Sequence, residues 1–106
     1  MAKELNETMF KAEVVDAKAA AMIDFWAPWC GPCRVMGPLV DNLSKKYDGK
    51  LVVAKVNVDD NQNLAGQFNI MSIPTILFFK GGKVVHTHVG STTEADLENL
   101  LKQHLL

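Results

Sequence analysis

One stretch decides the fold of this chain: Asp24-Phe25-Trp26-Ala27-Pro28-Trp29-Cys30-Gly31-Pro32-Cys33. Residues 20–27 are apolar on both faces apart from Asp24, which predicts a central strand of a sheet. An apolar stripe at helical spacing predicts a long helix over Cys33–Tyr47. The pair Cys30 and Cys33 therefore lies where a buried strand gives way to a helix.

This position makes the two cysteines candidates for thiol chemistry. A helix N-terminus carries unpaired backbone N–H groups and a partial positive charge, and both favour a thiolate over a thiol. A thiolate is the nucleophile in disulfide exchange, so we expect Cys30 to attack a substrate disulfide. We expect Cys33, one turn further into the helix, to be less exposed and to resolve the mixed disulfide. Gly31 leaves room for a substrate backbone, and Pro32 loses only an N–H that would be unpaired in the first turn.

Two other interpretations of the cysteine pair are weaker. A zinc site usually needs two further Cys or His ligands, but the chain has no other cysteine, and nothing places its three histidines near the pair. We expect these histidines, His86, His88 and His104, on the solvated surface. A structural disulfide across two residues would constrain the unfolded chain little.

Asp24 and Pro74 are the other unusual positions. Burial of Asp24 in an apolar strand should raise its pKa, and such a carboxyl group could take a proton from Cys33 during resolution. The alternative is that Asp24 points to an exposed end of the sheet. Pro74 precedes a buried run, and its peptide bond with Ile73 is either cis or that of an ordinary proline at the start of a strand.

The remaining pattern predicts an α/β fold. We expect helices over 6–15, 61–68 and 92–105, and strands over 51–58, 73–79 and 83–89. Gly81-Gly82 predicts a tight hairpin between the last two strands. Pro38 should kink the long helix or end its first segment. Strands separated by helices pair in parallel and a hairpin is antiparallel, so the sheet should be mixed, with helices on both faces.

Composition narrows the class of protein. With 48% hydrophobic and 22% charged residues, the 106 residues fit one globular domain over 1–106. The net charge of −1 is spread without a basic patch, so we expect neither nucleic acid nor a membrane surface as partner. Charges near the N-terminus exclude a signal peptide in this sequence, so we expect a cytoplasmic protein, although a mature secreted form would look the same. We also expect a monomer.

The stretch around the cysteines closely resembles the active-site signature of the thioredoxin family. Further similar segments extend the resemblance over nearly the whole chain: Pro38, 53–59, 72–75, 79–82 and 89–90. The resemblance implies the thioredoxin fold, with a mixed central sheet of four to five strands and a short first strand near residues 2–5. It also implies that Pro74 is cis and lies against the disulfide.

The resemblance also implies roles for individual residues. Around the catalytic Cys30, Cys33 and Asp24, the substrate would dock on a surface made of Trp29, Gly31, Pro32, Ile73, Pro74 and Gly90. Ile73 would offer its backbone to a substrate strand. Lys55 would lie near Asp24 and influence its titration, and Asp59 would accept a hydrogen bond from the Trp29 indole. Trp26 and Pro38 would support this site.

The Gly-Pro dipeptide between the cysteines resembles the reducing members of the superfamily. We therefore expect a protein-disulfide reductase with no bound cofactor or metal, kept reduced by an NADPH-dependent thioredoxin reductase. Three functions stay open: a general reductant of protein disulfides, a reductant dedicated to one pathway, and a binding subunit without turnover. Departures from the family pattern are Arg34, the alanine-rich 17–21 and Met71-Ser72, none of which touches the chemistry.

Overall fold

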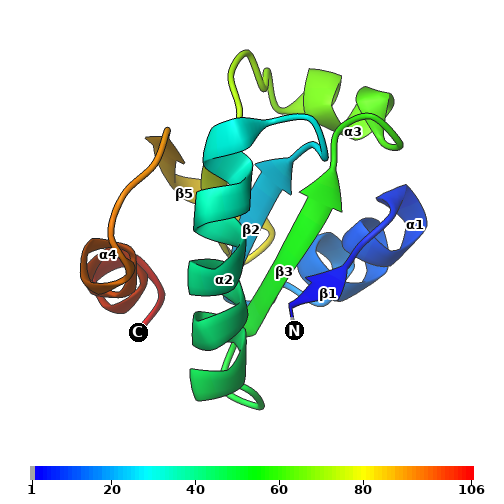
Figure 1. Cartoon of the computed structure of the whole chain (residues 1–106). Coiled ribbons are helices and arrows are strands. Elements are labelled where there is room, and N and C mark those ends of the chain that lie inside the picture. The colour runs from blue at the N-terminus through cyan, green and yellow to red at the C-terminus, as the bar shows by residue number, and fades with distance from the viewer. Residues whose placement is uncertain (1) are drawn as a thin grey trace.

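The computed structural model describes residues 2–106 as a mixed five-stranded sheet with helices on both faces (Figure 1). The strand order is β1-β3-β2-β4-β5. The strands are β1 (Lys3–Glu4), β2 (Ala21–Trp26), β3 (Val52–Asn57), β4 (Thr75–Lys80) and β5 (Lys83–Val89). Strand β3 runs parallel to β1 and β2, whereas β4 is antiparallel to β2 and β5. The predicted mixed α/β sheet is confirmed.

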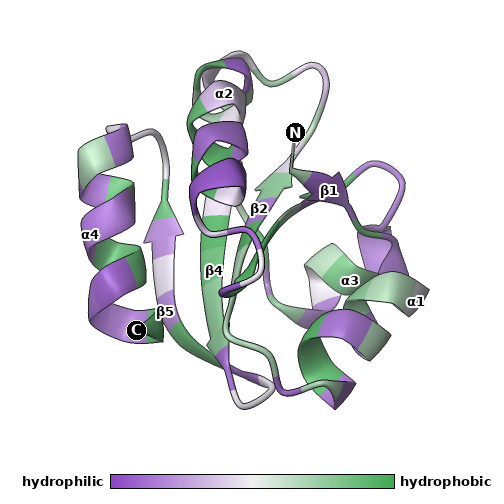
Figure 2. Cartoon of the chain, turned by 90° about the horizontal axis from the view of Figure 1, so that it is seen from below, coloured by the Kyte–Doolittle hydropathy of each residue, from purple (hydrophilic) through white to green (hydrophobic). Residues whose placement is uncertain are grey.

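The helices divide between the two faces of the sheet (Figure 2). They are α1 (Glu7–Phe10), the π-helical segment η1 (Lys11–Asp16), α2 (Gly31–Lys46), α3 (Gln62–Gln67) and α4 (Glu94–Leu105). Side chains of α2 and α4 pack with Met22 and Phe78 in one apolar cluster. Side chains of α1, η1 and α3 pack with Ile23 and Phe79 in another. Strand β2 is therefore covered on both sides, as its two-faced apolar sequence predicts.

The alternation along β2 places Asp24 on the same face as α2. Met22 packs with the α2 and α4 cluster, whereas Ile23 and Phe25 pack on the opposite side. Because successive strand residues point to opposite faces, Asp24 shares the face of Met22. The sheet thus directs its one fully buried carboxylate toward the underside of the long helix.

Most predicted elements are confirmed to within two residues, and the differences concern helix geometry. The predicted helix over 6–15 is split into α1 and η1. Helix α2 begins at Gly31 rather than at Cys33, and it continues through Pro38, so the proline does not end a first segment. Strand β1, which only the resemblance implied, is present over two residues.

Local hydrogen bonds explain where helices begin. The Asn6 side chain accepts from the Met9 amide at 2.8 Å, so Asn6 caps α1 as its residue type predicts. Thr93 caps α4, because its hydroxyl accepts a hydrogen bond from the Asp96 amide at 3.1 Å. In the hairpin, Gly81 and Gly82 both have positive φ, at 65° and 81°, which matches the backbone of a two-residue hairpin turn.

The expectation that all three histidines lie on the solvated surface holds only in part, because each of them is half-buried. The rings of His86 and His104 stack with centroids 4.2 Å apart, and both rings contact Phe78. Burial, followed by the neighbouring His104 and His88, lowers the pKa of His86. The Nε2 atom of His88 is buried without a hydrogen-bond partner. Packing of α4 beside β5 brings these residues together, and nothing in the local sequence indicates this packing.

Over residues 2–106, no helix combines the length and the apolar character needed to cross a membrane.

Candidate active site

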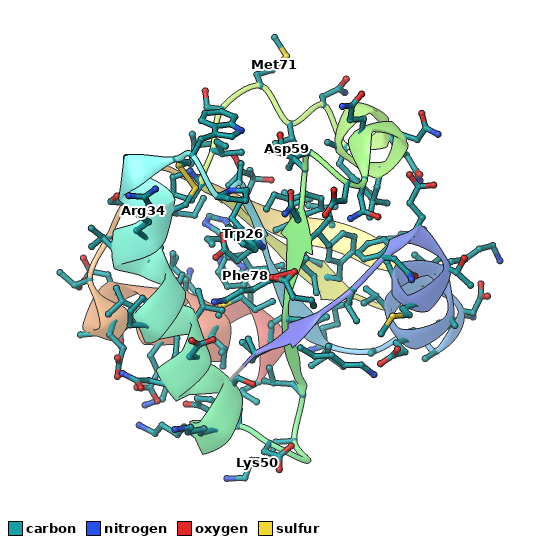
Figure 3. All side chains as sticks on the ribbon, turned by 45° about the vertical axis from the view of Figure 1, so that its right-hand side comes forward. Trp26, Arg34, Lys50, Asp59, Met71 and Phe78 are labelled. Atoms are coloured by element: carbon teal, nitrogen blue, oxygen red, sulfur yellow. A yellow bond between two sulfur atoms is a disulfide. The ribbon has the colours of Figure 1, made fainter. Side chains whose placement is uncertain are left out.

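Cys30 and Cys33 form a disulfide at the N-terminal end of α2 (Figure 3). Cys30 is the N-cap residue of the helix, and its Sγ accepts a hydrogen bond from the Cys33 amide at 3.2 Å. Both cysteines are buried, Cys30 with 5% and Cys33 with 3% of its surface exposed, so the predicted difference in exposure is small. The N-cap position gives the Cys30 sulfur the polar environment that stabilises a thiolate when the bond is reduced.

A second loop packs against the disulfide. The Ile73–Pro74 peptide bond is cis, and the Ile73 carbonyl oxygen lies 3.8 Å from the Cys30 Sγ. The Thr75 hydroxyl donates to the Ser72 carbonyl at 2.6 Å, and the Gly90 amide donates to the Pro74 carbonyl at 2.9 Å. Gly90 has φ +93°, a conformation that other residues rarely adopt. The loop of Ile73 and Pro74, distant from Cys30 in the sequence, therefore lies against the disulfide.

An open apolar surface adjoins this loop. Trp29 is 67% exposed, and its indole N–H donates to both carboxylate oxygens of Asp59, at 3.2 and 2.9 Å. A shallow surface pocket is lined by Trp29, Val58, Ile70, Met71, Ser72 and Ile73. Met71 is 91% exposed and projects from its loop into solvent (Figure 3). Exposed apolar side chains gathered beside a reactive group are typical of a surface that binds other proteins.

Asp24 is fully buried, and neither of its carboxylate oxygens has a hydrogen-bond partner. Burial raises the pKa of Asp24 to about 7, because the ionised form loses its hydration there. The positive charge of Lys55 opposes this rise, and the negative charges of Glu4 and Asp41 add to it. The alternative of an exposed sheet end is therefore wrong, since the carboxyl group lies inside the protein.

Lys55 lies beside Asp24 but pairs elsewhere. In the sheet Lys55 is in register with Asp24 of β2 and with Glu4 of β1. Its ammonium group forms an ion pair with Asp41 of α2, with Nζ and Oδ1 3.1 Å apart. Glu4 accepts a hydrogen bond from the Trp26 indole at 3.4 Å, and burial raises the pKa of Glu4. Three carboxyl groups thus surround a single lysine.

The structure brings most of the expected site residues together. Trp26 and Ile73 pack against the cluster of Ala27 and the two cysteines. Pro38 lies on an exposed part of α2, in the turn beyond the reactive pair. Arg34 is exposed and donates to the Pro28 carbonyl at 3.2 Å.

Several residues around the site were not predicted: Glu4, Asp41, Val58 and Ile70, together with any role for Met71. The register of β1 and β3 and the packing of α2 place Glu4 and Asp41, and neither feature has a local signal. Val58 follows a strand and Ile70 lies in a loop, where apolar residues are common. Met71 alone had a usable signal, as a departure from the family pattern. Within residues 2–106 no group of three or more His, Cys, Asp or Glu side chains is arranged to hold a metal ion.

Comparison with known proteins agrees with this geometry. A family model described as thioredoxin matches residues 1–103. Thioredoxin 1 of Nostoc sp. strain PCC 7120 is 45% identical over 98% of this chain and 97% of its own length. The thioredoxin of Chlorobaculum thiosulfatiphilum is 44% identical over 96% of this chain and 94% of its own. The chloroplastic M-type thioredoxin of Spinacia oleracea is 40% identical over 97% of this chain and 57% of its own length.

These relatives and the buried cysteine pair establish the chemistry. A dithiol that closes to a disulfide takes up two electrons and two protons when it is reduced again, and it delivers them when it reduces another disulfide. Such a pair at a helix N-terminus is the machinery of a thiol–disulfide oxidoreductase. The chain belongs to the thioredoxin family, with Cys30 and Cys33 as its redox-active pair.

Proposed function

We propose that residues 1–106 act as a single domain that reduces disulfides in many different proteins. The observation that carries this proposal is the Cys30–Cys33 disulfide beside an open, shallow apolar surface rather than in a deep cleft. A flat surface of this kind accommodates varied protein substrates, whereas a reductant dedicated to one partner gains from a more shaped site. We further propose that the chain works as a monomeric electron carrier in cytoplasmic redox homeostasis.

The reaction proceeds in two exchange steps. The Cys30 thiolate attacks one sulfur of the substrate disulfide, the substrate S–S bond breaks, and the other substrate sulfur leaves as a thiolate and is protonated. The Cys33 thiolate then attacks Cys30 Sγ, which breaks the mixed disulfide and releases the second substrate thiol. Two electrons pass to the substrate, and Cys30–Cys33 is left oxidised.

We propose that the substrate docks on the surface of Trp29, Gly31, Pro32, Ile73, Pro74 and Gly90. The open backbone next to Ile73 can pair with an extended substrate segment, in the manner of an added strand. Asp59 supports this surface because it holds the Trp29 indole at 2.9 Å. Trp26 supports the site by packing against the disulfide, and Pro38 supports it from the next part of α2. Lys55 influences the titration of Asp24 through its positive charge.

The partner that returns the protein to its reduced form is proposed to be a thioredoxin reductase that uses NADPH. The cofactor belongs to that partner, and this chain carries only the dithiol. Incubation with insulin, NADPH and a bacterial thioredoxin reductase should consume NADPH in proportion to the insulin reduced. Unrelated disulfide proteins should be reduced as well. If dithiothreitol supports turnover but the reductase does not, the electron donor is a different one. Turnover of a single protein in such a panel would favour a dedicated reductant.

Asp24 is proposed to take the proton of Cys33 in the second exchange step. Asp24→Asn should slow release of the second substrate thiol by about 10²-fold at pH 7, at the low end for general base catalysis. Since Asp24 acts as a base only when ionised, the native rate should fall as the pH drops below about 7. The measurement is rapid-mixing kinetics of the mixed disulfide between pH 5 and pH 9. Equal rates and equal pH profiles in both proteins would exclude this role.

A further inference from the structure

Lys55 is surrounded by the carboxyl groups of Glu4, Asp24 and Asp41, and it forms an ion pair with the one on helix α2. In the sheet, Glu4, Lys55 and Asp24 form one row across β1, β3 and β2. Helix α2 lies over this row and contributes Asp41, whose Oδ1 is 3.1 Å from the Lys55 Nζ. Asp24, although next to Lys55 in register, has no hydrogen-bond partner. The ammonium therefore pairs with the carboxylate of the helix and forms no hydrogen bond with Asp24.

Two further features hold this arrangement. The Ala2 amide donates to the same Asp41 oxygen at 2.9 Å, which fixes the carboxylate between α2 and the start of β1. A Cβ atom at Gly37 would lie 3.4 Å from the Lys55 Nζ, an ordinary contact distance, so the ammonium lies close to the surface of α2 at this glycine. Asp41 lies one turn after Gly37 on the same side of α2. The ion pair is mostly buried, with 13% of the Lys55 and 22% of the Asp41 side chain exposed.

We propose that Asp41 is a positioning residue that anchors the Lys55 ammonium on α2 and so keeps it from pairing with the Asp24 carboxylate that accepts the Cys33 proton. The proposal rests on the proton-accepting role proposed for Asp24. If Lys55 were released, it could turn toward Asp24, and an opposite charge at close range favours ionisation of a carboxyl group. An Asp24 carboxylate that is paired with an ammonium is a weaker base, so it would accept the Cys33 proton less readily.

The titration of the two aspartates agrees with this geometry. Burial alone would raise the pKa of Asp41, but the hydrogen bonds from Ala2 and Lys55 outweigh it and lower the pKa. Asp41 is therefore ionised and able to hold the lysine at neutral pH. In the described part of the chain the charged groups that act on Asp24 are Lys55 on β3, Glu4 on β1 and Asp41 on α2.

The test is a direct titration of Asp24 by the ¹³C chemical shift of its carboxyl group in the oxidised protein. Asp41→Asn retains an oxygen that accepts from the Ala2 amide but loses the charge that holds Lys55. The midpoint of the Asp24 titration should fall by about one pH unit in this variant. Asp41→Glu, which retains the charge, should restore a midpoint close to the native one.

A double-mutant cycle separates anchoring of Lys55 from the charge of Asp41 itself. If Asp41 acts through Lys55, the effect of Asp41→Asn on the Asp24 midpoint should shrink to less than half in a Lys55→Met background. An equal shift in both backgrounds would overturn the proposal, because Asp41 would then act by its own charge alone. No shift in the native background would also overturn it, because the released Lys55 would then not turn toward Asp24. The result is independent of resolution kinetics, so failure of the Asp24→Asn experiment would remove the role of Asp24 without affecting this titration.

Discussion

Replacing Cys30 with serine should lower insulin reduction in dithiothreitol to the rate of dithiothreitol alone. A serine hydroxyl at neutral pH is a far weaker nucleophile than a thiolate, and Cys30 is the sulfur that adjoins the Ile73 carbonyl at the open surface. The measurement is the turbidity of reduced insulin over time with equal amounts of each protein. Circular dichroism of the Cys30→Ser variant should match the native spectrum, which shows that the fold is intact.

Cys33→Ser is the matched variant and should behave differently. Its Cys30 can still attack, but the fast intramolecular second step is missing, since a neighbouring group reacts as if present at roughly 10⁵ M or more. A mixed disulfide with the substrate should therefore accumulate and be visible by mass spectrometry. The assigned order of attack would be reversed if a mixed disulfide formed on Cys33 in the Cys30→Ser variant and none formed on Cys30 in the Cys33→Ser variant.

Asp24→Asn should make the protein more stable, and the gain should grow as the pH rises. The pKa of Asp24 is raised from 3.8 to about 7 by burial, so between these values the folded state holds a proton that the unfolded state has lost. Folding therefore becomes less favourable with rising pH throughout this window, by about 1.4 kcal/mol for each pH unit. Between pH 5 and pH 8 the difference in unfolding free energy between the variant and the native protein should widen by roughly 3 kcal/mol.

Urea unfolding of both proteins at pH 5 and pH 8 measures this difference. The oxidised protein should be used, because the disulfide then removes any titration of the cysteines. Asp59→Asn is a suitable control, since it makes the same replacement of a carboxyl group by an amide at an exposed position. A stability difference for Asp24→Asn that is constant across this range would mean that Asp24 does not hold a proton in the folded state at neutral pH.

Local sequence patterns were sufficient to predict most helices and strands and the position of the reactive cysteine pair. The apolar run before Trp26 and the helical stripe after Cys33 are properties of neighbouring residues, so they predict β2, α2 and the cysteines between them. The Gly81-Gly82 hairpin likewise depends on two adjacent φ angles. Asp24 was recognised because a carboxyl group in an apolar strand is costly unless its pKa changes.

The resemblance to a family added what local patterns leave open. It implied the short β1, the cis bond before Pro74 and the hydrogen bond from Trp29 to Asp59, and all three are present. It also implied that Lys55 lies near Asp24, which the sheet register confirms. It did not indicate that Lys55 pairs with Asp41.

The sequence by itself determined strands β2 to β5, the helical segments and the position of the thiols, because these follow from residue spacing within one element. Only the tertiary structure decided that Asp41 holds Lys55, that Glu4 joins the same row, and that His86 stacks on His104. These contacts join residues from different elements, and their energies depend on strand register, on helix packing and on the water that packing removes. No pattern along the chain reports these three quantities, because they arise only when distant segments meet.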